Sequence, residues 1–168
     1  MSVPTESRFA EPNWRGPFVH YGGPAAPQEL TSDFVVVDVE TTGFTPHKGD
    51  RMLEVSAIRI NRNGEVLDEF TSLVNPDVED TGAEHVHGIA PQMLKDAPTF
   101  AEVFPSLQAI FSGAIFVAHH AKFDESFLGN EAQLAGKTFD LMPGMCTYVV
   151  AREVVRETPN HKLATLSQ

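Results

Sequence analysis

Short apolar runs separated by polar turns make up the chain from residue 34 onward. The run at 34–39 is β-branched and apolar, which is typical of a central strand covered on both faces. Residues 52–60 and 65–74 alternate apolar and polar positions, and Asn-Arg-Asn-Gly at 61–64 between them has the composition of a turn. The pattern therefore predicts three strands in a meander.

A helix and a fourth strand are expected next. Thr99 followed by Glu102 is a capping-box pattern, and apolar residues then recur at helical spacing as far as Phe111. Pro105 lies inside this helix and is expected to bend it. Residues 114–119 form another apolar run, which predicts a further buried strand.

Two helices complete the pattern, at residues 123–136 and 146–155. The inward face of the first is expected to consist of Phe123, Phe127, Leu128 and Leu134. The order strand, strand, strand, helix, strand, helix, helix describes a mixed sheet with helices packed on it. This order predicts an α/β fold.

The first 32 residues have a different character. They contain five prolines and three glycines and show no apolar period. We interpret residues 1–32 as a flexible Pro/Gly-rich extension. Trp14, Phe18 and Tyr21 are the side chains in it that could dock on another surface.

Composition narrows the class of protein. A length of 168 residues with 42% hydrophobic content suits one domain with a substantial core. The net charge of −11 argues against a broad basic face for nucleic acid, although bound divalent cations can invert the local field. Cys146 is the single cysteine, so no internal disulfide can form. No secretory signal or membrane-spanning run is evident, and we expect a cytoplasmic protein without membrane contact.

Two carboxylates close the first strand. Asp38 and Glu40 are two positions apart, so in a strand their side chains leave the same face. Carboxylates so close repel each other unless one is protonated or a cation lies between them, and Mg²⁺ and Mn²⁺ prefer such oxygen ligands. An arbitrary Asp-x-Glu pair most often marks only a solvated strand end. The apolar run before this pair and the Thr-Thr-Gly after it favour a site for a metal and an anionic substrate.

A second polar cluster follows the strand at 114–119. His119 and His120 lie at its end, and Asp124 begins the next helix. An Asp at this position can simply favour a helix N-terminus. Beside the first cluster, we interpret Asp124 as a third oxygen ligand.

These segments resemble those of a known family. "DVETTGF" at 38–44 and "HHAKFDESFL" at 119–128 look like the first and second motifs of the DnaQ-like, DEDD-type 3′–5′ exonucleases. "EHVHGIAPQMLKDAPTFAEVF" at 84–104 is similar to the connector between them. The resemblance, which includes the proofreading ε subunit, covers residues 33 to about 166.

The resemblance implies a ribonuclease H-like fold and a metal-dependent 3′–5′ exonuclease that removes nucleotides from a nucleic acid 3′ end. It implies two divalent cations, Mg²⁺ or Mn²⁺, held by the catalytic residues Asp38, Glu40 and Asp124. It further implies substrate contacts by six residues: Thr41, Thr42, Gly43, Phe44, His119 and Phe123. The expected partners are a single-stranded 3′ end, DNA rather than RNA, and a DNA polymerase. His120 departs from the pattern, because the family usually has Asn there.

The family's third motif is missing from these 168 residues. It would supply a fourth acid and a general base as His, four residues, then Asp, or as Tyr, three residues, then Asp. Only His119 has an Asp at the required distance, and that Asp124 already belongs to the second motif; neither Tyr21 nor Tyr148 fits. The sequence thus predicts an exonuclease domain at 33–168 that is truncated before its last catalytic helix and has little activity.

Two functions therefore stay open: an exonuclease, and a non-catalytic nucleic-acid- or polymerase-binding module that retains the exonuclease fold. His161 has the wrong spacing for the base, and Asp140 lacks a His or Tyr partner, so neither is assigned. His85 and His87 are expected to be structural or near the substrate, and Cys146 a small core residue.

Overall fold

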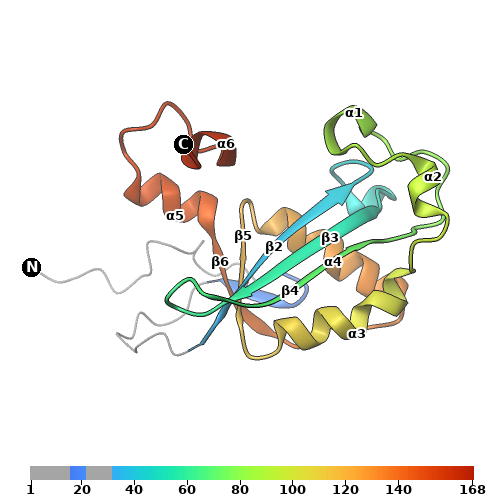
Figure 1. Ribbon diagram of the computed structural model, residues 1–168, viewed down its shortest axis with the longest axis horizontal. Coiled ribbons are helices and arrows are strands. Elements are labelled where there is room, and N and C mark those ends of the chain that lie inside the picture. The colour runs from blue at the N-terminus through green and yellow to red at the C-terminus, as the bar shows by residue number, and fades with distance from the viewer. Residues whose placement is uncertain (1–15, 22–31) are drawn as a thin grey trace, which may run out of the picture.

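The computed structural model describes residues 16–21 and 32–168, which form one six-stranded sheet with helices on both sides (Figure 1). The strand order is β1-β6-β5-β2-β3-β4. The β2–β3 and β3–β4 pairs are antiparallel, whereas β2–β5, β5–β6 and β6–β1 are parallel. The strands are β1 (Val19–Tyr21), β2 (Phe34–Thr41), β3 (Met52–Ile60), β4 (Val66–Leu73), β5 (Ile115–Ala118) and β6 (Met142–Cys146).

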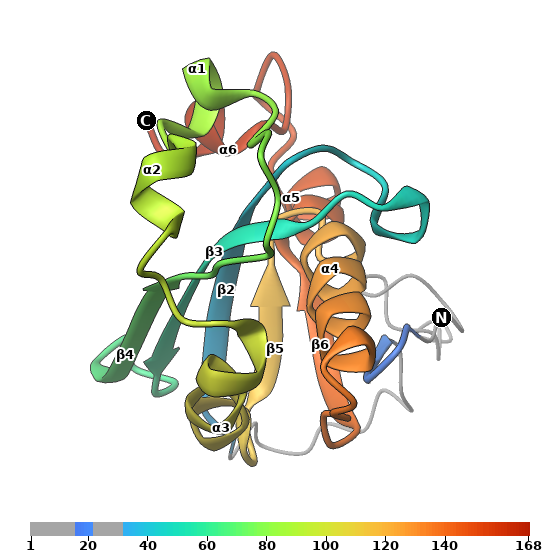
Figure 2. The same ribbon diagram turned by 90° about the vertical axis from the view of Figure 1, so that its right-hand side faces the viewer.

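The helices divide between the two faces of the sheet. Helices α3 and α4 cover one face (Figure 2), while α5 and α6 lie on the other side. Their bounds are η1 (Pro46–Lys48), α1 (Glu84–His87), α2 (Pro91–Leu94), α3 (Phe100–Phe111), α4 (Lys122–Leu134), α5 (Thr147–Val154) and α6 (Leu163–Leu166). In the part of the chain that the structure describes, no helix combines the length and apolar character needed to cross a bilayer.

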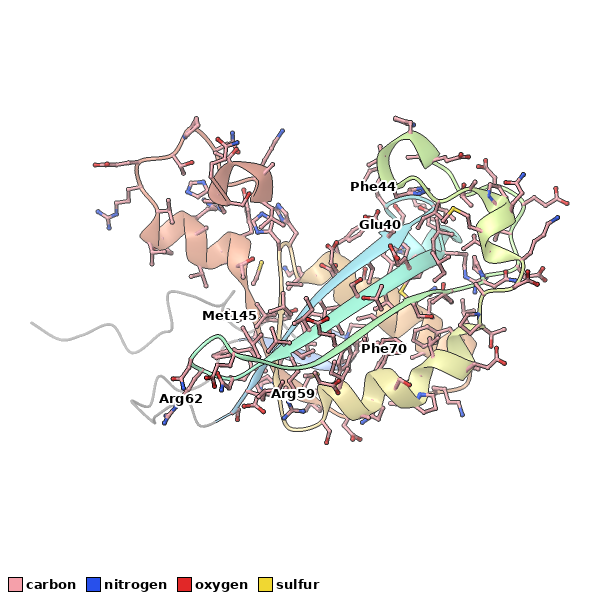
Figure 3. The ribbon with its side chains drawn as sticks, viewed as in Figure 1. Glu40, Phe44, Arg59, Arg62, Phe70 and Met145 are labelled. Atoms are coloured by element: carbon pink, nitrogen blue, oxygen red, sulfur yellow. The ribbon has the colours of Figure 1, made fainter. Side chains whose placement is uncertain are left out.

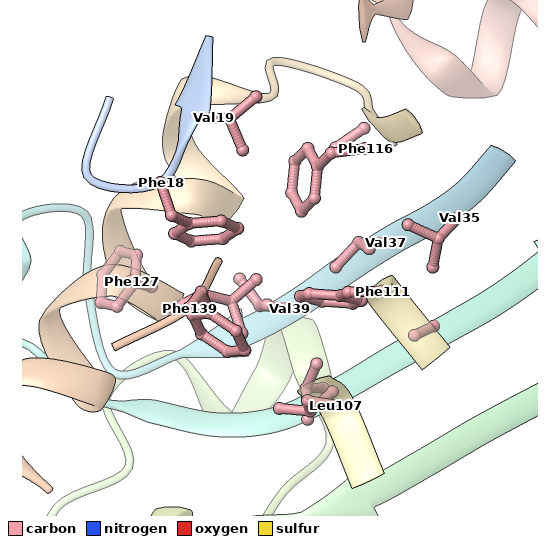
Figure 4. Packing of buried hydrophobic residues seen from close by; sticks show 14 of the residues in the cluster. Phe18, Val19, Val35, Val37, Val39, Leu107, Phe111, Phe116, Phe127 and Phe139 are labelled. Atoms are coloured by element: carbon pink, nitrogen blue, oxygen red, sulfur yellow. The ribbon is translucent and has the colours of Figure 1, made fainter. Parts of the chain in front are cut away.

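The core lies between the sheet and the helices α3 and α4 (Figure 4). Alternate residues of β2 point into it, and Val35, Val37 and Val39 are at most 6% exposed. Phe116 and Phe127 are fully buried in the same cluster. Because strand residues alternate between faces, burying these valines puts Asp38 and Glu40 on the opposite face of β2.

The predicted α/β fold is confirmed, and most predicted elements lie within a residue or two of their expected positions. The meander β2–β3–β4 and helix α5 are present, and α3 begins with the capping box of Thr99 and Glu102. Strand β6 was missed because Pro143 and Gly144 lie inside it, and both residues weaken a strand signal.

One predicted core position is wrong. Leu134 is 62% exposed, whereas Glu131, on the same helix α4, is 1% exposed. A charged residue takes the inward position because it has an ion-pair partner there, which the apolar pattern alone cannot reveal.

The N-terminal segment also differs from the expectation of a flexible extension. Residues 16–21 are part of the domain, with Phe18 and Tyr21 at 2% and 3% exposure. Strand β1 pairs in parallel with β6, from Val19 opposite Met142 to Tyr21 opposite Gly144. Trp14 and the rest of the extension up to residue 31 lie outside the described residues.

Candidate active site

The first two acids lie where β2 runs beyond its neighbour. Strand β5 pairs with β2 only at residues 34–36 and ends at Ala118, so residues 38–41 of β2 extend past the end of β5. Ligand sites in sheets of this kind form at the carboxyl ends of parallel strands. Glu40 lies at this end of β2, close to Phe44 (Figure 3). Asp38 and Glu40 share one face of the strand, as predicted.

The third acid comes to the same place from α4. Asp124 is in the first turn of this helix and is 2% exposed. Burial, and then the negative charges of Asp38 and Glu40, raise the pKa of Asp124 to about 8, although the backbone N–H of Val39 lowers it. The structure therefore brings the three predicted acids within electrostatic reach of one another.

The pKa values of the other two acids are also raised. Partial burial raises the pKa of Asp38. Burial and the charges of Asp38 and Glu54 raise the pKa of Glu40, while His87 lowers it. The cluster thus holds more negative charge than its surroundings neutralise.

Carboxylate oxygens of this kind suit a hard divalent cation, and a cation would offset the repulsion. The side chains are not pre-arranged as a cage, however. Within residues 16–21 and 32–168, no three His, Cys, Asp or Glu side chains already stand close enough together to hold a metal ion. The donor set fits a divalent ion in its chemistry, and binding requires the acids to move closer together.

The loop after Glu40 is tightly fixed to the start of β3. Thr42 donates its N–H to Arg51 O at 2.9 Å and accepts the Arg51 N–H on its hydroxyl at 2.9 Å. The Thr41 hydroxyl donates to Gly43 O at 2.6 Å. A side chain at Gly43 would collide with the Asp50 carboxylate, so this close approach requires glycine. A rigid loop beside the acids can present its backbone to a ligand in one orientation.

Aromatic rings lead from the core to the surface beside the acids. Phe127 is buried, and its ring centroid lies 5.0 Å from that of Phe123. Phe123 in turn lies 6.3 Å from Phe44, which is 87% exposed. A fully exposed Phe supported by a second ring is a ready stacking surface.

The two histidines of the second motif have different surroundings. His119 Nδ1 lies 3.0 Å from the Thr147 hydroxyl, which donates to Ala118 O at 3.3 Å. Nδ1 therefore carries the ring proton, and the buried Nε2 has no partner among the described residues. His120 has a left-handed backbone with φ of 63° and stacks on Tyr148 at 3.9 Å.

The sequence analysis missed a pocket beside this stack. Its volume is about 300 Å³, and Tyr148 and Arg152 from α5 line it together with His120 and Phe123. Burial, and then the nearby His119, lower the pKa of His120, which favours a neutral ring. The one available signal for this pocket was His120, which stands where the family usually has Asn. Both residue types tolerate the left-handed backbone found at this position.

The ion pair of Arg51 and Glu131 was also missed. The guanidinium forms two hydrogen bonds of 2.8 Å with the carboxylate, and a third reaches Pro76 O. Glu131 also accepts the N–H of Met52 at 3.2 Å. No pattern in the sequence points to this pair, because the two residues are far apart in the chain. The pair joins α4 to the strand that fixes Thr42.

The remaining candidates have hydrogen-bond partners of their own, although His87 is near enough to lower the pKa of Glu40. His87 accepts the Ile89 N–H on Nδ1 and pairs with Thr81 O through Nε2, so both ring nitrogens serve the loop. Asp140 binds Gln108 at 2.6 Å. His161 lies in the connection between α5 and α6 and pairs with Val155 O.

A mixed sheet with two acids toward the end of β2 and a third at the start of α4 is the arrangement of the ribonuclease H-like fold. The exonuclease family model RNase_T matches residues 35–168. The chain belongs to this family, and the predicted relationship to the DnaQ-like 3′–5′ exonucleases is confirmed.

Three relatives illustrate the relationship. The chain is 35% identical over 140 residues to DNA polymerase III PolC-type of Caldanaerobacter subterraneus, covering 83% of the chain and 10% of the relative. It is 38% identical over 151 residues to a DNA polymerase III subunit epsilon-like protein of Rhodobacter capsulatus, with 87% and 21% covered. Identity to the 3′-5′ exonuclease DinG of Bacillus subtilis is 34% over 136 residues, with 80% and 14% covered. The chain thus spans between a tenth and about a fifth of these relatives.

Solved structures support the fold. Escherichia coli exonuclease I in complex with a dT13 oligonucleotide has a TM-score of 0.70 at 20% identity, covering 81% of this chain and 35% of the other. The nuclease domain of 3′hExo, a DEDDh family member bound to rAMP, has a TM-score of 0.54 at 18% identity, with 65% and 62% covered.

Proposed function

We propose that this domain is a metal-dependent 3′–5′ exonuclease whose Asp38, Glu40 and Asp124 hold divalent cations, Mg²⁺ or Mn²⁺. The observation that carries the proposal is the convergence of three acids from β2 and α4, where burial, and then the charges of Asp38 and Glu40, raise the pKa of Asp124 to about 8. Two ions at such a site supply charge neutralisation of the phosphodiester and acidification of the attacking water. The acids orient those ions, and the loop after Glu40 orients the 3′ end.

The surroundings of the acids suit the end of a nucleic acid strand. Thr41, Thr42 and Gly43 offer hydroxyl and backbone groups to the terminal nucleotide. The exposed Phe44 ring can stack on its base, since base–aromatic stacking contributes about 1–3 kcal/mol. Phe123 supports that ring from behind. His119 is proposed as a further substrate contact, through its partnerless Nε2.

A single strand is the proposed substrate, and DNA is favoured over RNA. The pocket of His120, Tyr148 and Arg152 places aromatic surface and a cation next to Phe123, which suits the strand that follows the terminal nucleotide. The solved exonuclease I complex contains a dT13 oligonucleotide. The relatives named DNA polymerase III support an association with a polymerase in replication or repair. A cytoplasmic location stays a prediction.

The absent third motif limits what the 168 residues can do by themselves. A missing general base costs about 10²–10⁴-fold in rate, so we expect weak metal binding and slow turnover. A groove of about 680 Å³ lies between the sheet and α5–α6, lined mostly by apolar residues and bordered by Asp38.

A second function is a non-catalytic module that binds nucleic acid or a polymerase, which the absent third motif favours. Calorimetric titration with Mn²⁺ separates the two functions, because a scaffold has no need of a metal site. Binding that is lost in Asp38→Ala supports the exonuclease, and no binding at millimolar Mn²⁺ supports the scaffold.

The activity itself is tested with a 5′-labelled single-stranded oligonucleotide and Mn²⁺. We expect slow shortening from the 3′ end, with Asp38→Ala and Asp124→Asn inactive. Asn63→Ala, in the turn between β3 and β4 at the opposite end of β2 from Glu40, is the matched control and should behave as the wild type. Products that shorten from the 5′ end would contradict the proposal, and fast turnover lost in Asp38→Ala would contradict the expected low activity.

A further inference from the structure

Strand β1 lies outside the region matched by the exonuclease family, yet it is built into the domain. Phe18 packs against three rings, and its centroid lies 4.6 Å from that of Phe139. Val19 is fully buried. Phe18, Val19 and Tyr21 are therefore part of the hydrophobic core.

A buried acid of the second motif binds this strand. Glu125 is 0% exposed, and its Oε1 accepts the N–H of Phe18 at 3.0 Å and of Val19 at 2.6 Å. The Oε2 atom is buried without a partner among the described residues. Leaving two buried N–H groups unpaired is costly, so Glu125 and the start of β1 depend on each other.

Glycines provide the space for this contact. A Cβ on Gly16 would overlap the Glu125 carboxylate, and one on Gly129 would lie 2.6 Å from Pro17. A Cβ on Gly144 of β6 would overlap Val19. Side chains of β1 and α4 therefore pack directly against glycine backbone of their neighbours.

The first turn of α4 needs an external restraint. Its N-cap residue is Ala121, which offers no side-chain cap, so the usual anchor of a helix start is missing. The Asp124 carboxyl accepts the N–H of Val39 on β2, but the turn also brings this acid toward two like charges, which disfavour that position when the acids are ionised. Glu125 is the next residue and ties the same turn to β1.

We propose that Glu125 and β1 position Asp124 in the acid cluster. Glu125 is a positioning residue, which touches neither substrate nor metal, and β1 is the element it acts through. The contacts above support the restraint of α4 by Glu125 and β1. The effect of Glu125 on metal binding rests in addition on the proposed function.

Hydrogen exchange of the full chain tests the positioning directly. In Glu125→Ala, amides of residues 122–126 should exchange about ten- to a hundredfold faster relative to those of α3, because two hydrogen bonds are lost. Glu125→Gln keeps an oxygen acceptor and should restore protection. Should Glu125→Ala not fold, Gly16→Ala replaces it, because the added Cβ separates β1 from Glu125 without removing a core side chain.

Phe18→Ala is the matched control. It removes core packing from the same strand while keeping the Glu125 acceptor, so exchange should rise evenly across the domain. An even rise in Glu125→Ala as well, or no rescue by Glu125→Gln, would overturn the proposal.

Calorimetry with Mn²⁺ adds a second readout. Glu125→Ala and Gly16→Ala should weaken Mn²⁺ binding about tenfold or more, as loss of a residue that orients a metal ligand does, and Phe18→Ala should not. If the wild type does not bind Mn²⁺, the proposed function fails, while the exchange experiment still decides the role of Glu125. Wild-type binding that Glu125→Ala leaves unchanged would contradict the positioning role.

Discussion

The two ends of α4 both bury an acid, but they treat it in opposite ways. Near its end, Glu131 meets the Arg51 guanidinium in two hydrogen bonds of 2.8 Å and also accepts a backbone N–H. At its start, Asp124 is buried to the same degree and faces two further acids. Glu131 therefore has an opposite charge beside it, whereas Asp124, among the described residues, accepts only backbone N–H groups and has like charges beside it.

This contrast indicates which buried acid is structural and which is functional. A satisfied ion pair stabilises a fold once it is formed, whereas an acid held among like charges persists only where the rest of the fold constrains it. Asp124 is therefore the residue whose burial calls for an external cation. Changes at the two ends of the helix should have opposite effects on stability.

Breaking the ion pair should have the largest effect. Glu131→Ala leaves the Arg51 charge partly buried without its partner, and we expect a loss of about 3 kcal/mol in the free energy of unfolding. This expected loss is at the lower end of the range for breaking a buried ion pair, because the Arg51 side chain is 26% exposed. Urea denaturation measures it. Arg51→Met combined with Glu131→Leu should recover most of the loss, and a double variant as unstable as the single one would contradict this account.

Removing the charge at Asp124 should increase the free energy of unfolding, whereas breaking the ion pair decreases it. In EDTA at pH 8, Asp124→Asn should raise the free energy of unfolding by on the order of 2 kcal/mol, because a buried and repelled carboxylate becomes neutral. The same denaturation experiment measures it. Glu131→Gln is the matched control at the other end of α4 and should destabilise. A destabilised Asp124→Asn would show that Asp124 is satisfied within the protein.

The dependence of stability on pH follows from the raised pKa of Asp124. The folded pKa of Asp124, about 8, lies above its unfolded value, so the folded state binds more protons between about pH 4 and 8. The contribution of Asp124 to the stability of the metal-free protein should therefore be greatest below about pH 4 and fall as the pH rises to about 8, by up to about 1.4 kcal/mol per pH unit. Burial also raises the pKa of Glu125, to about 7, which adds to the fall in the same direction.

Unfolding curves from pH 5 to pH 8 in EDTA measure this slope. Asp124→Asn should make it shallower, with the remainder due mainly to Glu125. A slope that is unchanged in Asp124→Asn would show that the raised pKa of Asp124 is not the cause.

The smallest effect on stability is expected at Phe44. This side chain is 87% exposed, so Phe44→Ala should change the free energy of unfolding by less than about 0.5 kcal/mol. Binding of a single-stranded oligonucleotide, measured by fluorescence anisotropy, should nevertheless weaken by about 1–3 kcal/mol. Val86→Ala, which removes another exposed apolar side chain, is the control. Unchanged oligonucleotide binding in Phe44→Ala would remove Phe44 from the proposed substrate site.

The sequence predicted the elements whose side chains repeat regularly. The meander β2–β3–β4 and helix α3 followed from period and capping alone. Strands β1 and β6 did not, because they are short and contain or adjoin Pro and Gly, and their pairing is set by tertiary contacts. Asp38, Glu40 and Asp124 were found because two motifs carry them.

The surroundings of the site could not be found in this way. Arg51 and Glu131 are joined across 80 positions, and Glu125 reaches Phe18 across 107. A charged residue in a helix is normally read as exposed, so only the folded structure shows that α4 buries three acids. The pattern of residues therefore could not show that Glu131 pairs with a cation whereas Asp124 lies beside two other acids.

Thermal unfolding with and without Mn²⁺ tests the central claim most directly. At about a hundred times the dissociation constant, Mn²⁺ should stabilise the wild type by about 2.7 kcal/mol, which raises the unfolding temperature by roughly 5–10 °C. Asp124→Asn, already more stable in EDTA, should gain little from the metal. An equal rise in both proteins, or none in the wild type, would contradict a shared metal site at Asp38, Glu40 and Asp124.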